Sequence, residues 1–567
     1  MLICGLKLTH DGSVALLDDN RLIFSVEIEK ISNNPRYSLV SDLRVVPQIL
    51  QDFGFKTDDI DRFVIDGWDG RSNGVVNLQD FGRDLEILTA PYHENLASSV
   101  LSPGRTGTFT IAGGPVEYSS YFHVSAHLIG AYCTSPFARR GEPAFSLVWD
   151  GGMFPRLYWV DPRSGTIENG GPLFPLIGHI YATAGHHFGP WRRATDAATA
   201  DDLSVAGKLM AYIALGDARS EVKAVLRKQF AAHFDGDGIQ ARSFRDEIGG
   251  WGTQFEPSVR YLHPFYRDVA KDVSALGVSD EDVLASVHEF LQELLIDRIS
   301  AKIRSWKGAG PWNLTFSGGC ALNIKWNSAL RRNKLFADVW VPPFPNDSGA
   351  ALGTAACRLV GEQGLVPLEW HARRGPEVKP SQTPSGWRSE SCTPAELAAV
   401  LHETGAPVVV LNDRAELGPR ALGGRSILSP ASNPGMKDLL NRIKGREHYR
   451  PVAPICLVDE APAIFDPGTP DPHMLFEHRV RPDWLDRIPA IVHLDGTARL
   501  QTVSREDDPV LEEILQAYQR LSGIPVLCNT SANLNGSGFF PDVASAMEWG
   551  GVDLVWSAGT LYRRSFV

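Results

Sequence analysis

Two histidines four residues apart, His123 and His127, stand in the segment YFHVSAH. In a helix, side chains at this spacing lie on the same face, so two imidazoles can bind one metal ion. The H-E-x-x-H metalloproteases use the same spacing, but this segment lacks the glutamate that serves them as general base. Because the chain has 16 histidines, chance pairs occur, and the spacing predicts a metal site only if further ligands lie nearby.

Two aspartates can supply those further ligands. Asp150 follows the apolar segment AFSLVW, and Asp347 precedes the small-residue segment SGAALGTAACRLV. Two neutral imidazoles with one or two carboxylates suit a divalent transition metal such as Fe(II), Mn(II) or Zn(II). Both aspartates can instead cap helices or stabilise turns, because Asp before Gly or Ser often does so.

Three glycine loops have the chemistry of phosphate binding: THDGS (9–13), WDGG (149–152) and FSGGCALN (316–323). Backbone N–H groups exposed on such turns can bind anionic oxygens, although a glycine turn can also be only a turn. No G-x-x-x-x-G-K-[ST] segment is present, so none of them is a P-loop. The residues concerned are Gly12, Gly151, Gly152, Gly318, Gly319 and Asn323.

His10 lies in the first of these loops, beside Asp11. A histidine in a glycine loop titrates near neutral pH and can act as a general base. The same ring can instead serve only to cap the loop through a hydrogen bond.

The segment 414–450 is rich in cations. It has eight basic and three acidic residues, a balance of 8 − 3 = +5 in a chain of net charge −12. A solvated face explains part of this charge, but arginines in the glycine and proline turns of ELGPRALGGRSIL and IKGREHYRPVAP suit bidentate phosphate recognition. Few aromatic residues interleave them, which favours small phosphorylated substrates over nucleic acid. Downstream, HLDGTARLQTV adds Arg499, and VLCNTSANLNG supplies Asn529 and Ser531, which can bind an anion or stabilise a turn.

Alternating strands, glycine loops and helices predict an α/β protein whose ligands gather at the carboxyl ends of strands. The proline-rich, polar segment 361–393 reads as a linker, so we expect two domains, 1–375 and 376–567. The second begins with a helix in PAELAAVLHETG and a strand in PVVVLND.

The composition bounds the function. With 567 residues, 43% apolar and 22% charged, the chain has an ordinary globular composition, and its net charge of −12 argues against coating nucleic acid or anionic membranes. We expect no leader peptide and no membrane span, because no long uncharged apolar run is present. Seven scattered cysteines without a C-x-x-C pair favour free thiols in a reducing cytoplasm.

Taken together, the motifs make the chain similar to O-carbamoyltransferases of the NodU/CmcH family, which includes the tobramycin carbamoyltransferase and tailoring enzymes for ansamycin, coumarin and cephem antibiotics. The resemblance covers nearly the whole chain. Its carriers are HDGSVALL, HVSAH, WDGG, SGGCALN and NDSGAALGTA, followed by ELGPRALGGRSIL, KGREHYRPVAP, HLDGTARLQTV and NTSAN. The opening MLICGLKLTHDGS is similar to members that act on macrocyclic polyketides.

The resemblance implies a Kae1-like domain with the actin/Hsp70/sugar-kinase (ASKHA) fold, followed by a YrdC-like α/β domain. The YrdC-like domain would make carbamoyl-adenylate from carbamoyl phosphate and ATP, with Mg²⁺. The Kae1-like domain would transfer the carbamoyl group to a hydroxyl of a small-molecule acceptor, an antibiotic or other natural product. The expected partners are these substrates, with neither nucleic acid nor membrane, and the oligomeric state is open.

Carried over residue by residue, the resemblance also implies roles. His123, His127, Asp150 and Asp347 would hold Fe(II) or another divalent transition metal. His10 would be the general base, and the three glycine loops would lie near carbamoyl-adenylate. Carbamoyl phosphate and ATP would be bound by Arg420, Lys444, Arg450, Arg499, Asn529 and Ser531.

Two positions depart from the family pattern. Some relatives carry an acidic residue where this chain has Leu8, which favours a less polar acceptor. Others read N-T-S-F-N before a Gly-Glu-Pro turn, where this chain has Ala532 and then GSGFF, so the ATP site can differ locally.

Two rival functions belong to other classes. The first is threonylcarbamoyl-type transfer to tRNA, which the net charge and the lack of an extended basic stripe disfavour. The second is a non-catalytic ATP-binding regulator, which would have no use for the arginine-rich segment.

Overall fold

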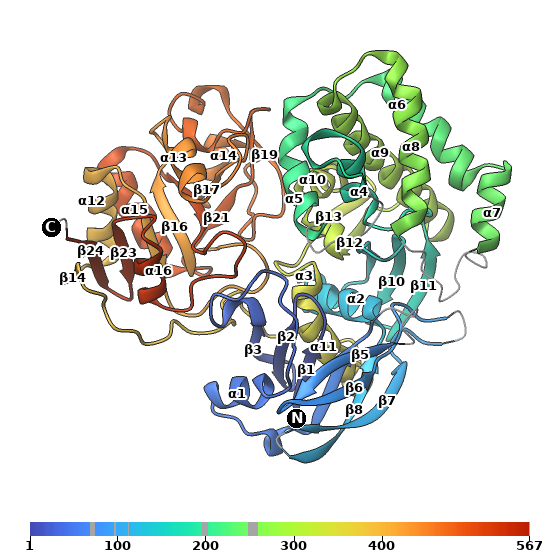
Figure 1. The fold of residues 1–567 in the computed structure, drawn as a ribbon, viewed down its shortest axis with the longest axis horizontal. Helices are drawn as coiled ribbons and strands as arrows, with labels where there is room; N and C mark the ends of the chain where they lie inside the picture. Colours follow the sequence, from blue (N-terminus) through green and yellow to red (C-terminus); the bar gives the residue numbers. More distant parts are fainter. Residues whose placement is uncertain (69–73, 96–97, 112, 195–201, 248–258, 566–567) are drawn as a thin grey trace. The chain divides into compact units, whose positions relative to one another are not determined.

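The computed structural model describes residues 1–68, 74–95, 98–111, 113–194, 202–247 and 259–565 (Figure 1). Contacts divide the chain into two compact units. The first unit contains Met1–Thr9, Val14–Leu22 and Val40–Glu369, and the second contains His10–Ser13, Ile23–Leu39 and Trp370–Val567.

This division differs from the predicted domains 1–375 and 376–567. The change falls at residue 370, and two amino-terminal segments group with the second unit. They do so because their polar groups bond to it: the buried Lys30 donates from Nζ to the carbonyl oxygens of Glu416 (2.5 Å) and Gly418 (2.7 Å). A local sequence pattern does not predict hydrogen bonds between residues that lie nearly 400 positions apart.

Two sheets organise the first unit, although most of β3, an edge strand of the larger one, groups with the second unit. The six-stranded sheet has the order β3-β2-β1-β4-β8-β7, and β1, β4 and β8 run parallel. The five-stranded sheet has the order β11-β10-β9-β12-β13, with β9, β12 and β13 parallel; β5 and β6 form a separate hairpin. The strands are β1 Leu2–Lys7, β2 Ser13–Asp18, β3 Arg21–Glu27, β4 Arg62–Asp66, β5 Val75–Asp80, β6 Arg83–Leu88, β7 Arg105–Ile111, β8 Gly114–Tyr121, β9 Ala144–Val148, β10 Arg156–Asp161, β11 Thr166–Pro172, β12 Trp312–Ser317 and β13 Phe336–Trp340.

The first unit contains helices that pack on these sheets and helices that pack on one another. They are α1 Val45–Asp52, α2 His123–Cys133, α3 Pro136–Arg140, α4 Ile180–His187, α5 Asp202–Tyr212, α6 Ser220–Phe230, α7 Ile239–Glu247, α8 Leu262–Val273, α9 Asp280–Trp306, α10 Ile324–Arg332 and α11 Ala350–Gln363. Helix α11 packs on β1 and β4, α2 packs on β9 and β12, and the two helices pack against each other (Figure 1). This arrangement brings the start of α2 and the start of α11 together.

Small residues allow that close helix packing. All eleven residues of α2 are buried, so the helix has no solvent face. A Cβ added at Gly353 of α11 would lie 2.0 Å from the carbonyl oxygen of Ala126 in α2, and one added at Gly5 of β1 would lie 2.0 Å from that of Ala351. Any larger residue at either glycine would push α11 away from the site.

The second unit is built on an eight-stranded sheet of order β14-β24-β23-β15-β16-β22-β17-β21, with a three-stranded sheet β18-β19-β20. Along β15, Val408 and Val410 face one core, while Val409 and Leu411 face another, so helices cover both sides. Its strands are β14 Trp387–Ser391, β15 Val408–Leu411, β16 Arg425–Pro430, β17 Ala453–Leu457, β18 Phe465–Asp466, β19 His478–Val480, β20 Thr497–Ala498, β21 Gln501–Val503, β22 Val526–Ser531, β23 Leu554–Ser557 and β24 Thr560–Arg564. Its helices are α12 Pro394–Thr404, α13 Met436–Ile443, α14 Ala461–Ile464, α15 Pro509–Ser522 and α16 Val543–Trp549.

Several local predictions are confirmed. The class is α/β, the predicted helix and strand of the second domain are α12 and β15, and α12 begins with a Thr393–Glu396 capping box. All seven cysteines are free. Among the described residues, no helix combines the length and apolar character needed to cross a membrane.

Candidate metal centre and cationic site

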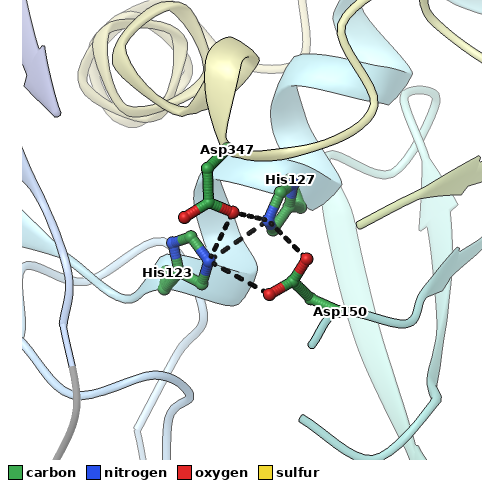
Figure 2. A group of neighbouring side chains, drawn as sticks. All are labelled: His123, His127, Asp150 and Asp347. Carbon is green, nitrogen blue, oxygen red and sulfur yellow. Dashed lines mark hydrogen bonds and ion pairs between the residues drawn. The ribbon is translucent and has the colours of Figure 1, made fainter. Parts of the chain in front are cut away.

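The histidine pair lies where the sequence predicts it, at the start of α2. Phe122 is the N-cap and His123 is the first helical residue, so the two imidazoles lie one turn apart, edge to face with their planes at 74°. Their Nε2 atoms are 3.2 Å apart, and both side chains are buried (Figure 2). Two ring nitrogens that face each other at this distance can share one proton or one metal ion.

The two predicted aspartates complete the cluster. Asp150 follows β9, and Asp347 lies in the short turn before α11. Asp347 Oδ1 is 3.3 Å from His123 Nε2 and 3.5 Å from His127 Nε2, while the Asp150 oxygens lie 3.8 Å and 4.0 Å from the same atoms (Figure 2). The structure therefore brings together four residues that the sequence separates by more than 200 positions.

The donor set fits a divalent transition metal. One ligand atom from each of the four residues lies within 4.8 Å of all the others. Metal bonds of about 2.0–2.2 Å in a tetrahedral site place ligand atoms about 3.3–3.6 Å apart, close to the separations seen here. Two imidazole nitrogens with two carboxylates also match the ligand preferences of Fe(II), Mn(II) and Zn(II).

An outer layer orients this cluster. Asp66, at the end of β4, accepts a hydrogen bond from His123 Nδ1 at 2.7 Å, which turns Nε2 toward the centre. Lys7, at the end of the neighbouring parallel strand β1, lies 3.0 Å from Asp66 Oδ2 and 2.8 Å from Asp347 Oδ2. The lysine thus contacts Asp347, a carboxylate of the cluster, and Asp66, the carboxylate that orients His123.

Charges within the cluster shift its pKa values. Burial alone would lower the pKa of His123, but the carboxylates of Asp66 and Asp347 raise it well above its ordinary value. Burial and Asp347 would raise the pKa of Asp150, yet His123 and His127 lower it to about 2. The carboxylates are therefore held as anions that demand nearby positive charge.

The glycine loops shape the centre more than they expose N–H groups. Gly319 N donates to Asp150 Oδ1 at 2.6 Å, and Gly318 N donates to the carbonyl oxygen of Pro345. Gly318 has φ +89°, and a Cβ there would lie 2.4 Å from the Trp149 carbonyl oxygen, so this turn needs glycine.

The remaining loop residues divide in the same way. Gly12 N donates to the Ser38 carbonyl oxygen at 2.8 Å. Gly152 lies against the Tyr92 ring, and a Cβ added at Gly152 would lie 2.9 Å from that ring. Asn323 caps α10 through Oδ1, and its buried Nδ2 has no hydrogen-bond partner. Because Gly12, Gly318 and Gly319 already use their N–H groups, phosphate binding by these loops stays a prediction that rests on Gly151, Gly152 and Asn323.

His10 groups with the second unit. Its Nδ1 lies 2.9 Å from Asp11 Oδ2, a contact that orients the ring, and Asp11 has a positive φ of 55°. The role of His10 as general base stays a prediction.

The predicted cations of the second unit form one electrostatic cluster. Burial, with the positive charges of Arg499, Arg36 and Arg450, lowers the pKa of Arg420 well below its usual range. Burial with Arg446 and Arg450 lowers the pKa of Arg499 to about 10. The Nε atoms of Arg420 and Arg499 are buried and have no hydrogen-bond partner among the residues that the structure describes. Arg450 lies 3.6 Å from Glu447, but buried cations that repel one another are typical of a site for an anion.

Lys444 has protein acceptors that the sequence does not indicate. Its buried Nζ donates to the Ser531 carbonyl oxygen (2.8 Å) and to both the carbonyl oxygen and Oδ1 of Asn533 (2.6 Å each). Burial, with the charges of Arg446 and Arg36, lowers its pKa to about 6, while these three acceptors favour the charged amine. Its N–H groups therefore hold the NTSAN turn, and the phosphate contact predicted for Lys444 stays a prediction.

We expect Lys444→Met to lower the free energy of unfolding by about 1–3 kcal/mol, because buried acceptor oxygens lose their donor. Urea unfolding of the full chain measures this change, with Lys437→Met on α13 as the control. Loss of pyrophosphate release at unchanged stability would instead restore Lys444 as a direct substrate ligand.

Asn529 and Ser531 lie on β22 beside this cluster. Asn529 Nδ2 donates to Gln501 Oε1 (2.7 Å) and to the Ala421 carbonyl oxygen (3.1 Å), and its buried Oδ1 has no partner. Ser531 Oγ donates to Asn533 Oδ1 at 2.7 Å, and Arg446 Nη2 lies 3.3 Å from the same hydroxyl. Ser531 therefore contacts the cation Arg446, whereas Asn529 bonds to Gln501 and to Ala421, the residue after Arg420.

The two departures from the family pattern are buried. Leu8 is 2% exposed, so its apolar side chain offers no surface by which the polarity of an acceptor can be judged. Ala532 is fully buried, and its N–H donates to the Arg425 carbonyl oxygen at 2.9 Å.

Sequence reasoning missed several residues of both sites: Lys7, Asp66, Arg36, Arg446 and Asn533. Lys7 and Asp66 carried a signal, because each is a charged residue at the end of an otherwise apolar strand, LICGLK and RFVID. Arg446 was among the cations of the predicted basic segment but was not singled out.

The chain matches two models of known protein families. The model for "Carbamoyltransferase N-terminus" matches residues 2–357, and that for "Carbamoyltransferase C-terminus" matches residues 398–556. The chain belongs to the carbamoyltransferase family.

Curated relatives extend along the whole chain. Nodulation protein U of Sinorhizobium fredii is 49% identical over 564 residues, which cover 100% of this chain and 99% of the relative. Nodulation protein U of Rhizobium tropici is also 49% identical, with 100% and 97% covered. The 3'-hydroxymethylcephem-O-carbamoyltransferase of Streptomyces clavuligerus is 32% identical, with 100% and 99% covered. These relationships confirm the predicted NodU/CmcH resemblance and support carbamoyl transfer to a hydroxyl group.

Among solved structures, a ROK family glucokinase from Streptomyces griseus in complex with glucose and AMPPNP matches 63% of this chain and 98% of its own at 10% identity. Its TM-score of 0.26 is too low to show a common fold. The ASKHA and YrdC-like assignments therefore stay predictions.

Proposed function

We propose that the chain is an ATP-dependent O-carbamoyltransferase that forms carbamoyl-adenylate from carbamoyl phosphate and ATP and transfers the carbamoyl group to a hydroxyl of a natural product. The observation that carries the proposal is the group of mutually repelling arginines whose buried Nε atoms lack partners, in a member of the carbamoyltransferase family. Such a group suits phosphate-rich substrates, because each arginine can donate two hydrogen bonds in parallel.

The first step supplies reactivity. A carbamoyl group is a poor electrophile because its nitrogen donates electrons into the carbonyl. Hydrolysis of carbamoyl phosphate gives carbamate and phosphate; a carbamate oxygen then attacks the α-phosphorus of ATP, the bond to the β-phosphate oxygen breaks, and pyrophosphate leaves. In this scheme Arg420, Arg450 and Arg499, with Arg446, neutralise the phosphate charge as it shifts to pyrophosphate, while Mg²⁺ accompanies ATP.

The second step is the transfer of the carbamoyl group. His10 would take the proton of the acceptor hydroxyl, whose oxygen attacks the carbamoyl carbon as AMP leaves. His123, His127, Asp150 and Asp347 would hold Fe(II) or another divalent metal, which would supply Lewis acidity toward phosphate oxygens. Asp66 and Lys7 keep these ligands oriented through the bonds described above.

The acceptor belongs to the proposal as well. A hydroxylated macrocyclic polyketide remains the proposed class, on the sequence of the opening segment. The relative from Streptomyces clavuligerus is named for a hydroxymethyl cephem, so compact acceptors also belong in the test. Incubation with carbamoyl phosphate, ATP and a panel of a macrocyclic polyketide, a hydroxymethyl cephem and an oligosaccharide should give one product heavier by one carbamoyl group.

The same experiment separates the rivals. Carbamoylation of none of these alcohols, with salt-sensitive transfer to an adenine of tRNA, would favour threonylcarbamoyl-type chemistry. ATP–pyrophosphate exchange that ignores carbamoyl phosphate would favour a regulator.

Asp66→Asn should weaken metal affinity by about 10- to 100-fold, because asparagine does not hold the ligating His123 as a carboxylate does. Equilibrium dialysis with elemental analysis measures the loss. The exposed carboxylate of Asp58 gives a control in Asp58→Asn, and equal metal content in all three proteins would remove Asp66 from the metal centre.

A further inference from the structure

Lys7 is a buried cation of the first unit to which the proposed chemistry assigns only the orientation of metal ligands. Its side chain is 1% exposed, and its Nζ bonds both the ligand Asp347 and the outer carboxylate Asp66. The Trp68 ring lies 4.7 Å from Nζ and covers the ammonium on another side. A lysine so enclosed acts as a fixed unit of positive charge.

The charges of the cluster can be counted. The side chains of Asp66 and Asp347 are 0% and 3% exposed, and that of Asp150 is 13% exposed. The three carboxylates and the ammonium of Lys7 together have a net charge of −3 + 1 = −2, which is called the balance below. A divalent ion brings the balance to zero, whereas a trivalent ion leaves one uncompensated positive charge in a buried site, which is costly.

We propose that Lys7 makes this centre select a divalent over a trivalent metal ion. The inference rests on the proposed function in one respect, that the four ligands hold a metal. Without the lysine, a divalent ion would leave the balance at −1 and a trivalent ion would bring it to zero, so the preference should reverse. Asp66 has the opposite effect, because without its carboxylate the net charge of the cluster is more positive by one with either ion bound.

The expected size follows from Coulomb's law. Lys7 lies one carboxylate away from the ligand atoms, so its charge lies roughly 6 Å from a bound ion. At an effective dielectric constant of about 20, that unit charge changes the affinity for a trivalent ion relative to the affinity for a divalent ion by on the order of 100-fold. Only the ratio between ions of different charge is predicted in this way. General loosening of the site would change both affinities together.

Competition between Mn²⁺ and citrate-buffered Ga³⁺ on the full chain tests the proposal, with bound metals counted by elemental analysis after dialysis. Lys7→Met should raise the Ga³⁺ to Mn²⁺ ratio by on the order of 100-fold. Asp66→Asn should lower the ratio by a similar factor, and the double variant Lys7→Met/Asp66→Asn should return it to the wild-type value. Lys30→Met removes an equally buried lysine of the second unit and should leave the ratio unchanged.

The outcomes separate the two levels of inference. Metal bound by every protein with an unchanged ratio would overturn the role of Lys7 and leave the metal centre intact. No metal on folded wild-type protein would overturn the metal centre and the role of Lys7 with it. If Lys7→Met does not fold alone, the double variant Lys7→Met/Asp66→Asn compared with Asp66→Asn still decides, because removing the ammonium should raise the Ga³⁺ to Mn²⁺ ratio in that background too.

Discussion

Replacing Arg499 with alanine is expected to lower carbamoyl phosphate-dependent pyrophosphate release by about 100- to 1000-fold, the effect of removing one preorganised donor from a developing negative charge. In the free protein the Arg499 guanidinium is half-buried, its Nε lacks a partner, and burial with the charges of Arg446 and Arg450 depresses its pKa. Its presence therefore opposes folding of the free chain, and its expected benefit appears only with an anion bound.

The opposite effects of Arg499 on the free and the anion-bound protein can be measured separately. Arg499→Ala should unfold at the same or a higher temperature than wild type, while inorganic phosphate should raise the unfolding temperature of wild type more than that of the variant. Arg505→Ala, an exposed arginine on the same segment, should match wild type in both assays. Normal pyrophosphate release by Arg499→Ala would remove this arginine from substrate binding.

Replacing His10 with alanine is expected to lower product formation by about 100- to 10,000-fold while pyrophosphate release without acceptor stays near the wild-type rate, since a general base acts only when the hydroxyl attacks. The ring is oriented by the 2.9 Å contact between its Nδ1 and Asp11 Oδ2. Quenched reactions separated by mass spectrometry measure the adenylate and the carbamoylated product in one sample.

His402→Ala is the matched control, because His402 is an exposed histidine on α12. It should leave both steps unchanged. A parallel loss of pyrophosphate release and product in His10→Ala would show that the two steps are not divided as proposed.

The sequence predicts the four candidate metal ligands because residue type and local position are enough to recognise each of them. Two histidines at helical spacing and two aspartates at strand or helix ends each carry a recognisable signal, and parallel strands bring such ends together. The structure confirms that His123, His127, Asp150 and Asp347 converge.

The layer that supports the quartet could not be predicted in the same way. Lys7 and Asp66 meet only because β1 and β4 pair in parallel register, with Leu6 opposite Ile65, and that register is a tertiary fact. Likewise, the segment Ile23–Leu39 groups with a unit that begins at Trp370, through bonds that no local pattern encodes.

Lys444 shows a different limit. Its residue type and its place among cations favoured a phosphate ligand, yet its ammonium is used by three oxygens of the NTSAN turn. Residue type indicates what a side chain can bind, but packing decides what it does bind.

The central claim is that carbamoyl transfer proceeds through a carbamoyl-adenylate. The most direct measurement compares wild-type protein given carbamoyl phosphate and an accepted alcohol with and without ATP. We predict carbamoylated product, AMP and pyrophosphate in equal amounts with ATP, and no product without it. Equal product yields in the absence of ATP would contradict the account.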